Sequence, residues 1–189
     1  MRSTFFWIQA GLLLGVPALT MGLLAEEFRA GTMLLLGSLP LSPVELVLGK
    51  WGYAVVLVAI ALLLTAPWPV LLWSYGALDP GPVFAGYLGL LLAGVTLGAV
   101  GTACSAATDS QVVAFLSTLA LALVPWSVGL ALTAVPAAWV PVIQPLTVAH
   151  YLDPFSAGVL ELRGVVFFGT ATAVALRVAV HLLDARRLR

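Results

Sequence analysis

Charge is scarce in this chain of 189 residues, because Asp, Glu, Lys and Arg together make up only 8% of it. An average soluble domain carries about 25% charged residues. Eight basic and eight acidic residues cannot cover a soluble globule of this length. An ordinary soluble fold is therefore excluded, and the 62% apolar content excludes disorder. A net charge of zero excludes nucleic acid as a partner, because no basic stripe is present to neutralise phosphates.

Cysteine and the common catalytic motifs are also lacking. The single cysteine, Cys104, excludes an intrachain disulfide and a cysteine metal cluster, and we expect it to be a small buried apolar residue. The sequence contains neither G-x-S-x-G nor H-E-x-x-H. His150 and Asp153 are three residues apart, a spacing that is common by chance. We therefore expect no catalytic, cofactor-binding or metal site, and an intramembrane enzyme is the least favoured class.

A phosphate-binding loop is absent from the one Gly-Lys pair, Gly49 and Lys50. Val44 stands where that loop needs its first glycine, and Trp51 stands where it needs Ser or Thr. If ATP drives a process here, another subunit must bind and hydrolyse it.

Long uncharged stretches are what the chain has in abundance. A helix needs about 20 apolar residues to cross a bilayer. The lengths of the uncharged stretches between charged residues predict an all-α membrane protein with a single domain of five spans. The predicted spans are residues 4–24, 52–75, 83–106, 111–134 and 165–183. The first is too long for a signal peptide and lacks a small-x-small cleavage site.

The segment 135–163 is not expected to be a clean span. Pro136, Pro141 and Pro145 remove backbone donors and disfavour helix at the residues before them. We expect a broken segment that is re-entrant or lies at the membrane surface. Asp153 and Pro154 predict the start of a short helix that ends near Leu162.

The distribution of Lys and Arg predicts the orientation of the spans. A cytoplasmic C-terminus places five basic residues inside and two, Arg2 and Arg163, outside. The five are Arg29, Lys50, Arg186, Arg187 and Arg189. The N-terminus is then external, and the loop 25–51 is cytoplasmic. An external start suggests that a preceding span is missing from this chain or is supplied elsewhere.

The loop 25–51 carries signals for two helices. Ser42, Pro43 and Glu45 predict a capping box that starts the second span in the cytoplasm. A short helix is predicted from Glu26 to Leu36, ended by Gly37. It would lie along the membrane face or dock on a protein.

Two further signals lie in the third predicted span and in the turn that follows it: one for packing and one for capping. Thr108 and Gln111 have the spacing of a capping box in a tight turn between helices. The third span is rich in glycine, and small residues at four-residue spacing in it permit close helix packing, either within the chain or with a second copy. The glycines are Gly86, Gly89, Gly94, Gly98 and Gly101.

Arg177 and His181 lie in the last span at i and i+4, on one helix face. Arg177 is about 10 Å from the cytoplasmic end, given a rise of about 1.5 Å per residue, so its side chain can snorkel. We interpret the two as membrane-interface anchors, together with Lys50, Arg186 and Arg187. Contact with a partner or a transported head group is the alternative.

The most specific pattern in the chain is E-x-x-x-G-T, then L-P, then E-x-x-x-G-K. It comprises Glu27 to Thr32, Leu39 with Pro40, and Glu45 to Lys50. This pattern resembles that of type-2 ABC exporter permeases, with the gliding-motility GldF and NosY-like permeases as the most similar group. The resemblance continues at residues 79–87, 108–111 and 150–163 and at Arg186 and Arg187, and it extends from about Val16 to the C-terminus. Leu34 departs from it, because the family often has Glu at that position.

The resemblance implies a six-span permease that dimerises with a second permease copy in the plasma (inner) membrane. The loop after its second span would be a coupling helix docked on a cytoplasmic ABC ATPase, which binds the ATP. An extracytoplasmic auxiliary protein and membrane lipid are further implied partners. The five spans here would correspond to the family's last five. The implied ATPase-coupling residues are Glu26, Glu27, Phe28, Arg29, Gly31 and Thr32.

Two functions from different classes follow. The first is a permease subunit that exports an unidentified substrate with energy from a separate ATPase. The alternative is a non-transporting membrane scaffold, or a degenerate permease, that anchors partner proteins. The two differ in whether an ATPase binds stoichiometrically.

Overall fold

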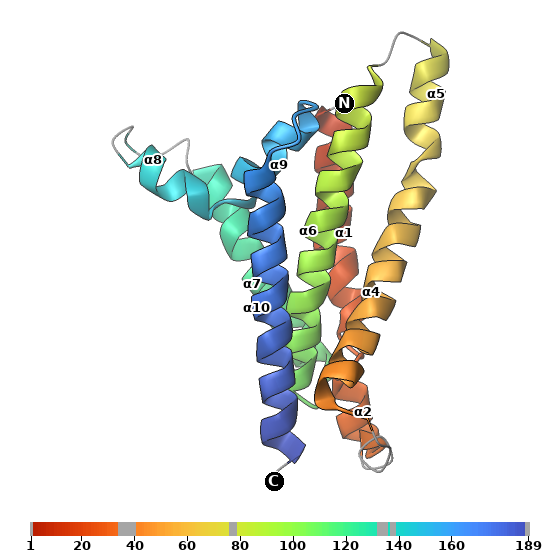
Figure 1. The fold of residues 1–189 in the computed structure, drawn as a ribbon, viewed down its shortest axis with the longest axis vertical. Coiled ribbons are helices and arrows are strands. Elements are labelled where there is room, and N and C mark those ends of the chain that lie inside the picture. The colour runs from red at the N-terminus through yellow and green to blue at the C-terminus, as the bar shows by residue number, and fades with distance from the viewer. Residues whose placement is uncertain (1, 34–40, 76–78, 132–135, 137–138, 188–189) are drawn as a thin grey trace.

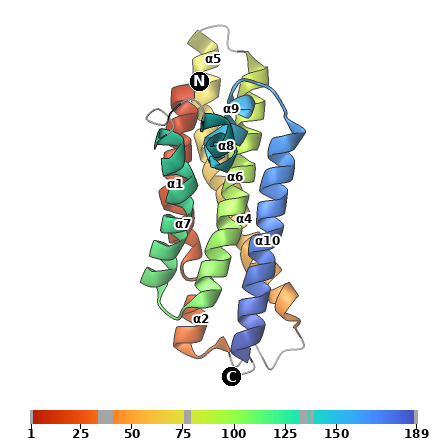
Figure 2. The same cartoon turned by 90° about the vertical axis from the view of Figure 1, so that its left-hand side faces the viewer.

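The computed structural model describes residues 2–33, 41–75, 79–131, 136 and 139–187. Within these residues every regular element is helical, which agrees with the predicted all-α class. Five stretches are long and apolar enough to cross a membrane: Thr4–Ala30, Pro43–Ser74, Pro80–Ala107, Gln111–Gly129 and Leu162–Arg186. They match the five predicted spans in order and are consistent with a multi-pass membrane protein. The helices run roughly parallel in one elongated bundle, with the two chain ends at opposite ends of it (Figures 1 and 2).

Helix α6, Pro80–Ala107, is the centre of the bundle and, besides its contact with α2, packs extensively against five other helices. They are α1 (Arg2–Thr20), α4 (Pro43–Thr65), α7 (Gln111–Ala131), α9 (Val148–Ser156) and α10 (Leu162–Arg187). Asp79 caps the start of α6 by accepting a hydrogen bond from the backbone N–H of Gly81.

The glycines of α6 make these close approaches possible, and they face helices of the same chain. A Cβ on Gly86 would lie 2.3 Å from the Phe5 ring, and one on Gly94 would lie 2.6 Å from Cγ1 of Val58. The glycine face predicted from the sequence therefore packs within this chain, against α1, α4 and α9.

The second predicted span is two helices. Helix α4 begins at Pro43 with the predicted capping box of Ser42 and Glu45. It ends at Thr65, and α5 follows over Pro67–Tyr75. The predicted span 52–75 corresponds to the stretch Pro43–Ser74, and this stretch is interrupted at Ala66 because Pro67 has no N–H to continue the ladder.

The first predicted span is also followed by a break. Helix α1 ends at Thr20, a turn occupies residues 21–24, and the short helix α2 covers Ala25–Ala30. The prediction of a helix from Glu26 to Leu36 was wrong at its end. Gly31 adopts the left-handed conformation (φ 73°), and its N–H bonds to the Phe28 carbonyl. This glycine ends the helix one turn after it begins; Gly37 lies outside the described residues.

The turn between α6 and α7 is tight, as predicted, but its capping differs. Thr108 is the C-terminal cap residue of α6, and its hydroxyl accepts from the N–H of Ser110, not of Gln111. The predicted Thr108–Gln111 capping box was therefore wrong. The carbonyl of Ser110 instead accepts the first bond of α7, from Ala114.

The segment after α7 is broken into short pieces, as its prolines predict. They are α8 (Val140–Ile143), a 3₁₀ turn (Gln144–Leu146) and α9, which covers one end of the bundle beside α6 and α10 (Figure 1). The predicted helix start at Asp153 was wrong. Thr147 caps α9 by accepting from the N–H of His150, and Asp153 lies inside the helix.

Candidate functional site

The predicted coupling residues lie at the end of the bundle opposite α9. There α2 meets the first turns of α4, the α6–α7 turn and the last turns of α10 (Figure 1). We refer to this region as the α2 corner. It comprises α2 with Ser105, Asp109, Lys50 and Arg186.

Ser105 of α6 fastens the first turn of α2. Its hydroxyl oxygen accepts hydrogen bonds from the backbone N–H groups of Leu24 (2.9 Å) and Ala25 (3.0 Å). The same hydroxyl donates to the carbonyl of Met21 (3.0 Å). Since Leu24 has no side chain that could cap α2, a serine 80 residues away supplies the missing cap. Helix α2 is thereby bonded to the central helix.

Glu27 joins α2 to α4. Its carboxylate accepts from Nζ of Lys50 at 2.7 Å and from the hydroxyl of Thr32. Both side chains of the ion pair are partly buried. The ion pair joins the two sequence motifs, because Glu27 is the first residue of E-x-x-x-G-T and Lys50 is the last residue of E-x-x-x-G-K.

Arg186 joins α10 to α2 and to the α6–α7 turn. Its guanidinium pairs with the carboxylate of Asp109 and donates to the carbonyl of Ala107 (2.6 Å). Its Cζ also lies 4.7 Å from the ring centroid of Phe28, a cation–π arrangement. One arginine therefore holds three elements together.

An apolar cluster lies beneath these polar links. Val47 of α4 and Leu183 of α10 are fully buried in it, and Phe28 of α2 packs on its edge. Phe28 thus packs against the bundle and anchors α2 there. From the sequence, the helix that contains Phe28 was expected to lie along the membrane face or to dock on a protein.

The outer face of α2 is exposed. Glu26, Arg29, Ala30 and Gly31 all face outward, while Ala25 is fully buried. The predicted coupling residues therefore divide into two sets. Glu27, Phe28 and Thr32 fasten α2 to the chain, and Glu26 and Arg29 remain on the side where another protein can dock.

The predicted interface anchors also divide. Lys50 and Arg186 belong to the ion pairs of the α2 corner. Arg177 and His181 are both exposed on α10, and no ion pair involves them among the described residues. Arg187 ends α10, but its side chain lies outside the described residues.

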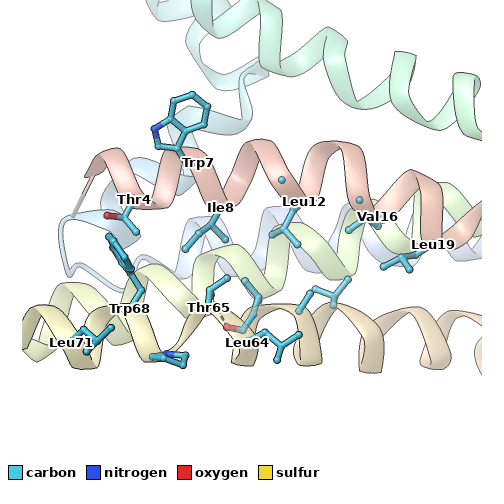
Figure 3. Close-up of a pocket in the computed structure, with 16 residues that line it drawn as sticks. Thr4, Trp7, Ile8, Leu12, Val16, Leu19, Leu64, Thr65, Trp68 and Leu71 are labelled. Atoms are coloured by element: carbon cyan, nitrogen blue, oxygen red, sulfur yellow. Dashed lines mark hydrogen bonds between the residues drawn. The ribbon is translucent and has the colours of Figure 1, made fainter.

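A groove runs from the α2 corner along α1, between α1 and the pair α4 and α5. Figure 3 shows Ile8, Leu12 and Leu19 pointing from α1 toward α4 and α5. The groove has a volume of about 800 Å³ and an almost wholly apolar lining. At Leu19 it meets a second cavity of about 700 Å³, which Glu26, Glu27 and Lys50 line.

Sequence reasoning missed the roles of Ser105 and Asp109. Both are small polar residues near the end of a glycine-rich span, and such residues indicate helix ends or caps. Their partners are 80 and 77 residues away in the chain, and spacing along one helix carries no signal for such pairs.

Comparisons with protein-family models, with curated proteins and with solved structures gave no match. Among the described residues, no group of three His, Cys, Asp or Glu side chains is placed to hold a metal ion. The site is a short, exposed helix that is fastened to three spans by charged and buried polar links.

Proposed function

We propose that the chain is the permease subunit of an ABC-type exporter in the plasma (inner) membrane, with α2 as the element that a separate cytoplasmic ATPase moves. The observation that carries this proposal is the fastening of α2. Ser105, Lys50 and Arg186 tie it to α6, α4 and α10, while Glu26 and Arg29 face outward.

A displacement of α2 would be transmitted to the central helix first. The hydrogen bonds to Ser105 connect α2 directly to α6, and α6 packs against most of the bundle. Packed helices shift as rigid bodies, so a push on a fastened helix moves the helices bonded to it. The contacts of α2 favour a path through α6 and α10.

In this proposal ATP is bound and hydrolysed by the partner subunit and not by this chain. The C-terminus is cytoplasmic, and the ends of α9 and α10 near Arg163 are external. A second permease copy completes the transporter. Two observations support this assignment. The two charged motifs resemble those of type-2 ABC exporter permeases, and the ion pair between Glu27 and Lys50 links these motifs.

The ion pair between Glu27 and Lys50 offers a direct test. A reporter cysteine at Ser156, on α9, is placed in a chain with Cys104→Ala, in native membrane vesicles. We expect ATP, but not ADP, to change the labelling rate of this cysteine by a permeant thiol reagent. Glu27→Lys places two cations side by side and should abolish the ATP-dependent change without preventing membrane insertion.

The swapped double variant, Glu27→Lys with Lys50→Glu, is the matched control. It restores the pair with its charges reversed, so the ATP response should return if Glu27 acts by fastening α2. An ATP response that survives in Glu27→Lys alone would show that α2 is not the moved element. A response absent from the unsubstituted chain would favour the scaffold function.

A further inference from the structure

A second pair of cavities lies on the other side of α1, away from the α2 corner. The first is an apolar cavity of about 340 Å³ among α1, α6, α7 and α10. Residues from all four helices line it, including Leu12, Leu97, Leu121, Ala122 and Phe168. The second, of about 550 Å³, lies nearer α9, and its lining includes Gln9, Asp153 and Ser156.

The two cavities adjoin. Gln9, Leu90 and Trp126 line both of them, so a molecule could extend from one into the other. One end of the combined space is apolar, and the other carries a carboxylate, an amide and a hydroxyl. Such a space fits an amphipathic molecule, with its tail against α6 and its head beneath α9.

The combined space is closed toward the α2 corner and open toward α9. Near the start of α7, Ala114 and Thr118 are fully buried against the bundle. Further along, α7 tilts away from α10 toward the α8 end (Figure 1), and Leu121, which lines the apolar cavity, is 58% exposed. A ligand therefore enters from the side of α9 or between α7 and α10.

The charge of the lining selects the head group. Among the described residues that line the two cavities, Asp153 is the one ionisable side chain. A carboxylate without a lining cation attracts a cation and repels an anion. Asp153 is itself exposed, so the preference is moderate.

We propose that this space binds an amphiphile with one apolar tail and a protonated amine head, the tail in the apolar cavity and the amine at Asp153. That such a molecule is also the exported substrate rests on the proposed function; that it binds does not. No residue of α2 lines either cavity, so that binding and coupling are separately testable.

The test uses three photoreactive probes with the same diazirine-bearing dodecyl chain and different heads: an amine, an alcohol and a carboxylic acid. The full chain is purified without an ATPase and placed in phosphatidylcholine nanodiscs, whose neutral surface does not sort the probes by charge. Crosslinked residues are then mapped by mass spectrometry. We expect the amine probe to label Leu97, Leu121 and Phe168 about fivefold more than the acid probe does.

Two variants identify the groups responsible. Asp153→Asn should lower labelling of these residues by the amine probe about fivefold and leave labelling by the alcohol unchanged. Ala122→Phe, which fills the apolar cavity from α7, should lower labelling by all three probes. Glu161→Gln is the matched control, because Glu161 is an exposed carboxylate near the same end that lines neither cavity.

Equal labelling by amine and acid would overturn the proposal. So would equal effects of Asp153→Asn and Glu161→Gln, or labelling of the cavity no stronger than that of the exposed Leu63 and Leu64 on α4. None of these results bears on the ATP response of α2. A failure of ATPase coupling, in turn, would leave the binding result standing.

Discussion

At the scale of single residues, Ser105 shows how a membrane bundle satisfies a helix end. The backbone N–H groups of Leu24 and Ala25 are fully buried and have no partner within their own helix turn. An unbonded donor in an apolar setting is costly, so the serine hydroxyl from α6 determines where α2 can lie. Residues that cap their own helix, such as Ser42 and Glu45, were predictable from spacing. Ser105 was not, because its partners come from the other end of the chain.

Ser105→Ala should destabilise the protein by about 1–3 kcal/mol, because it leaves buried N–H groups unbonded. Thermal unfolding in mild detergent measures the loss, and faster amide exchange at residues 24–28 would locate it. Ser117→Ala is the control, because the Ser117 hydroxyl bonds only to the Ala114 carbonyl of its own helix. Equal destabilisation by both substitutions would contradict the capping role.

At the scale of elements, the spans were predictable because lipid requires long uncharged helices, and the gaps between charges measure them. The breaks were less predictable. The chain turns at Ala66, before Pro67, and α2 ends at Gly31. By contrast, Pro17 and Pro125 lie inside continuous helices. Whether a proline or glycine ends a helix depends on the packing around it, which the sequence of one segment does not contain. The residues of α2 were predicted as a coupling set, but Ser105 and Asp109 were missed, and the division of the set into fastening and exposed side chains needed the fold.

The glycines of α6 give a test of this packing. A Cβ at Gly101 would lie 2.0 Å from Oγ1 of Thr20, and Thr20 is fully buried. Gly101→Ala should therefore cost about 1–3 kcal/mol of stability by overpacking. At Gly98 the nearest atom would be 3.5 Å away, at Ala54, so Gly98→Ala should be neutral or stabilising by up to about 1 kcal/mol. The unfolding midpoints of the two variants measure these changes in stability. If Gly98→Ala destabilises the protein and Gly101→Ala does not, α6 packs differently from the structure described.

At the scale of the whole molecule, the bundle has two unlike ends. Arg29, Lys50 and Arg186 lie at the α2 corner, whereas Arg163 lies at the other end, 5.7 Å from the Tyr151 ring. This arrangement agrees with the charge count from the sequence and predicts a cytoplasmic α2. The groove along α1 and the cavities beneath α9 lie on opposite sides of α1.

The orientation can be measured with single cysteines in a Cys104→Ala background. An impermeant thiol reagent added to intact cells should label Glu161→Cys, and should label Arg29→Cys only after the membrane is opened. The reverse pattern would place α2 outside and exclude contact with a cytoplasmic ATPase.

Affinity purification of the chain from native membranes in mild detergent tests whether α2 docks on an ATPase. We expect a nucleotide-hydrolysing subunit to co-purify in about a one-to-one ratio. Arg29→Glu, on the exposed face of α2, should remove it, while Arg163→Glu, at the opposite end, should not. A folded, inserted chain that co-purifies with no ATPase would show that α2 is not an ATPase docking site and would favour a membrane scaffold.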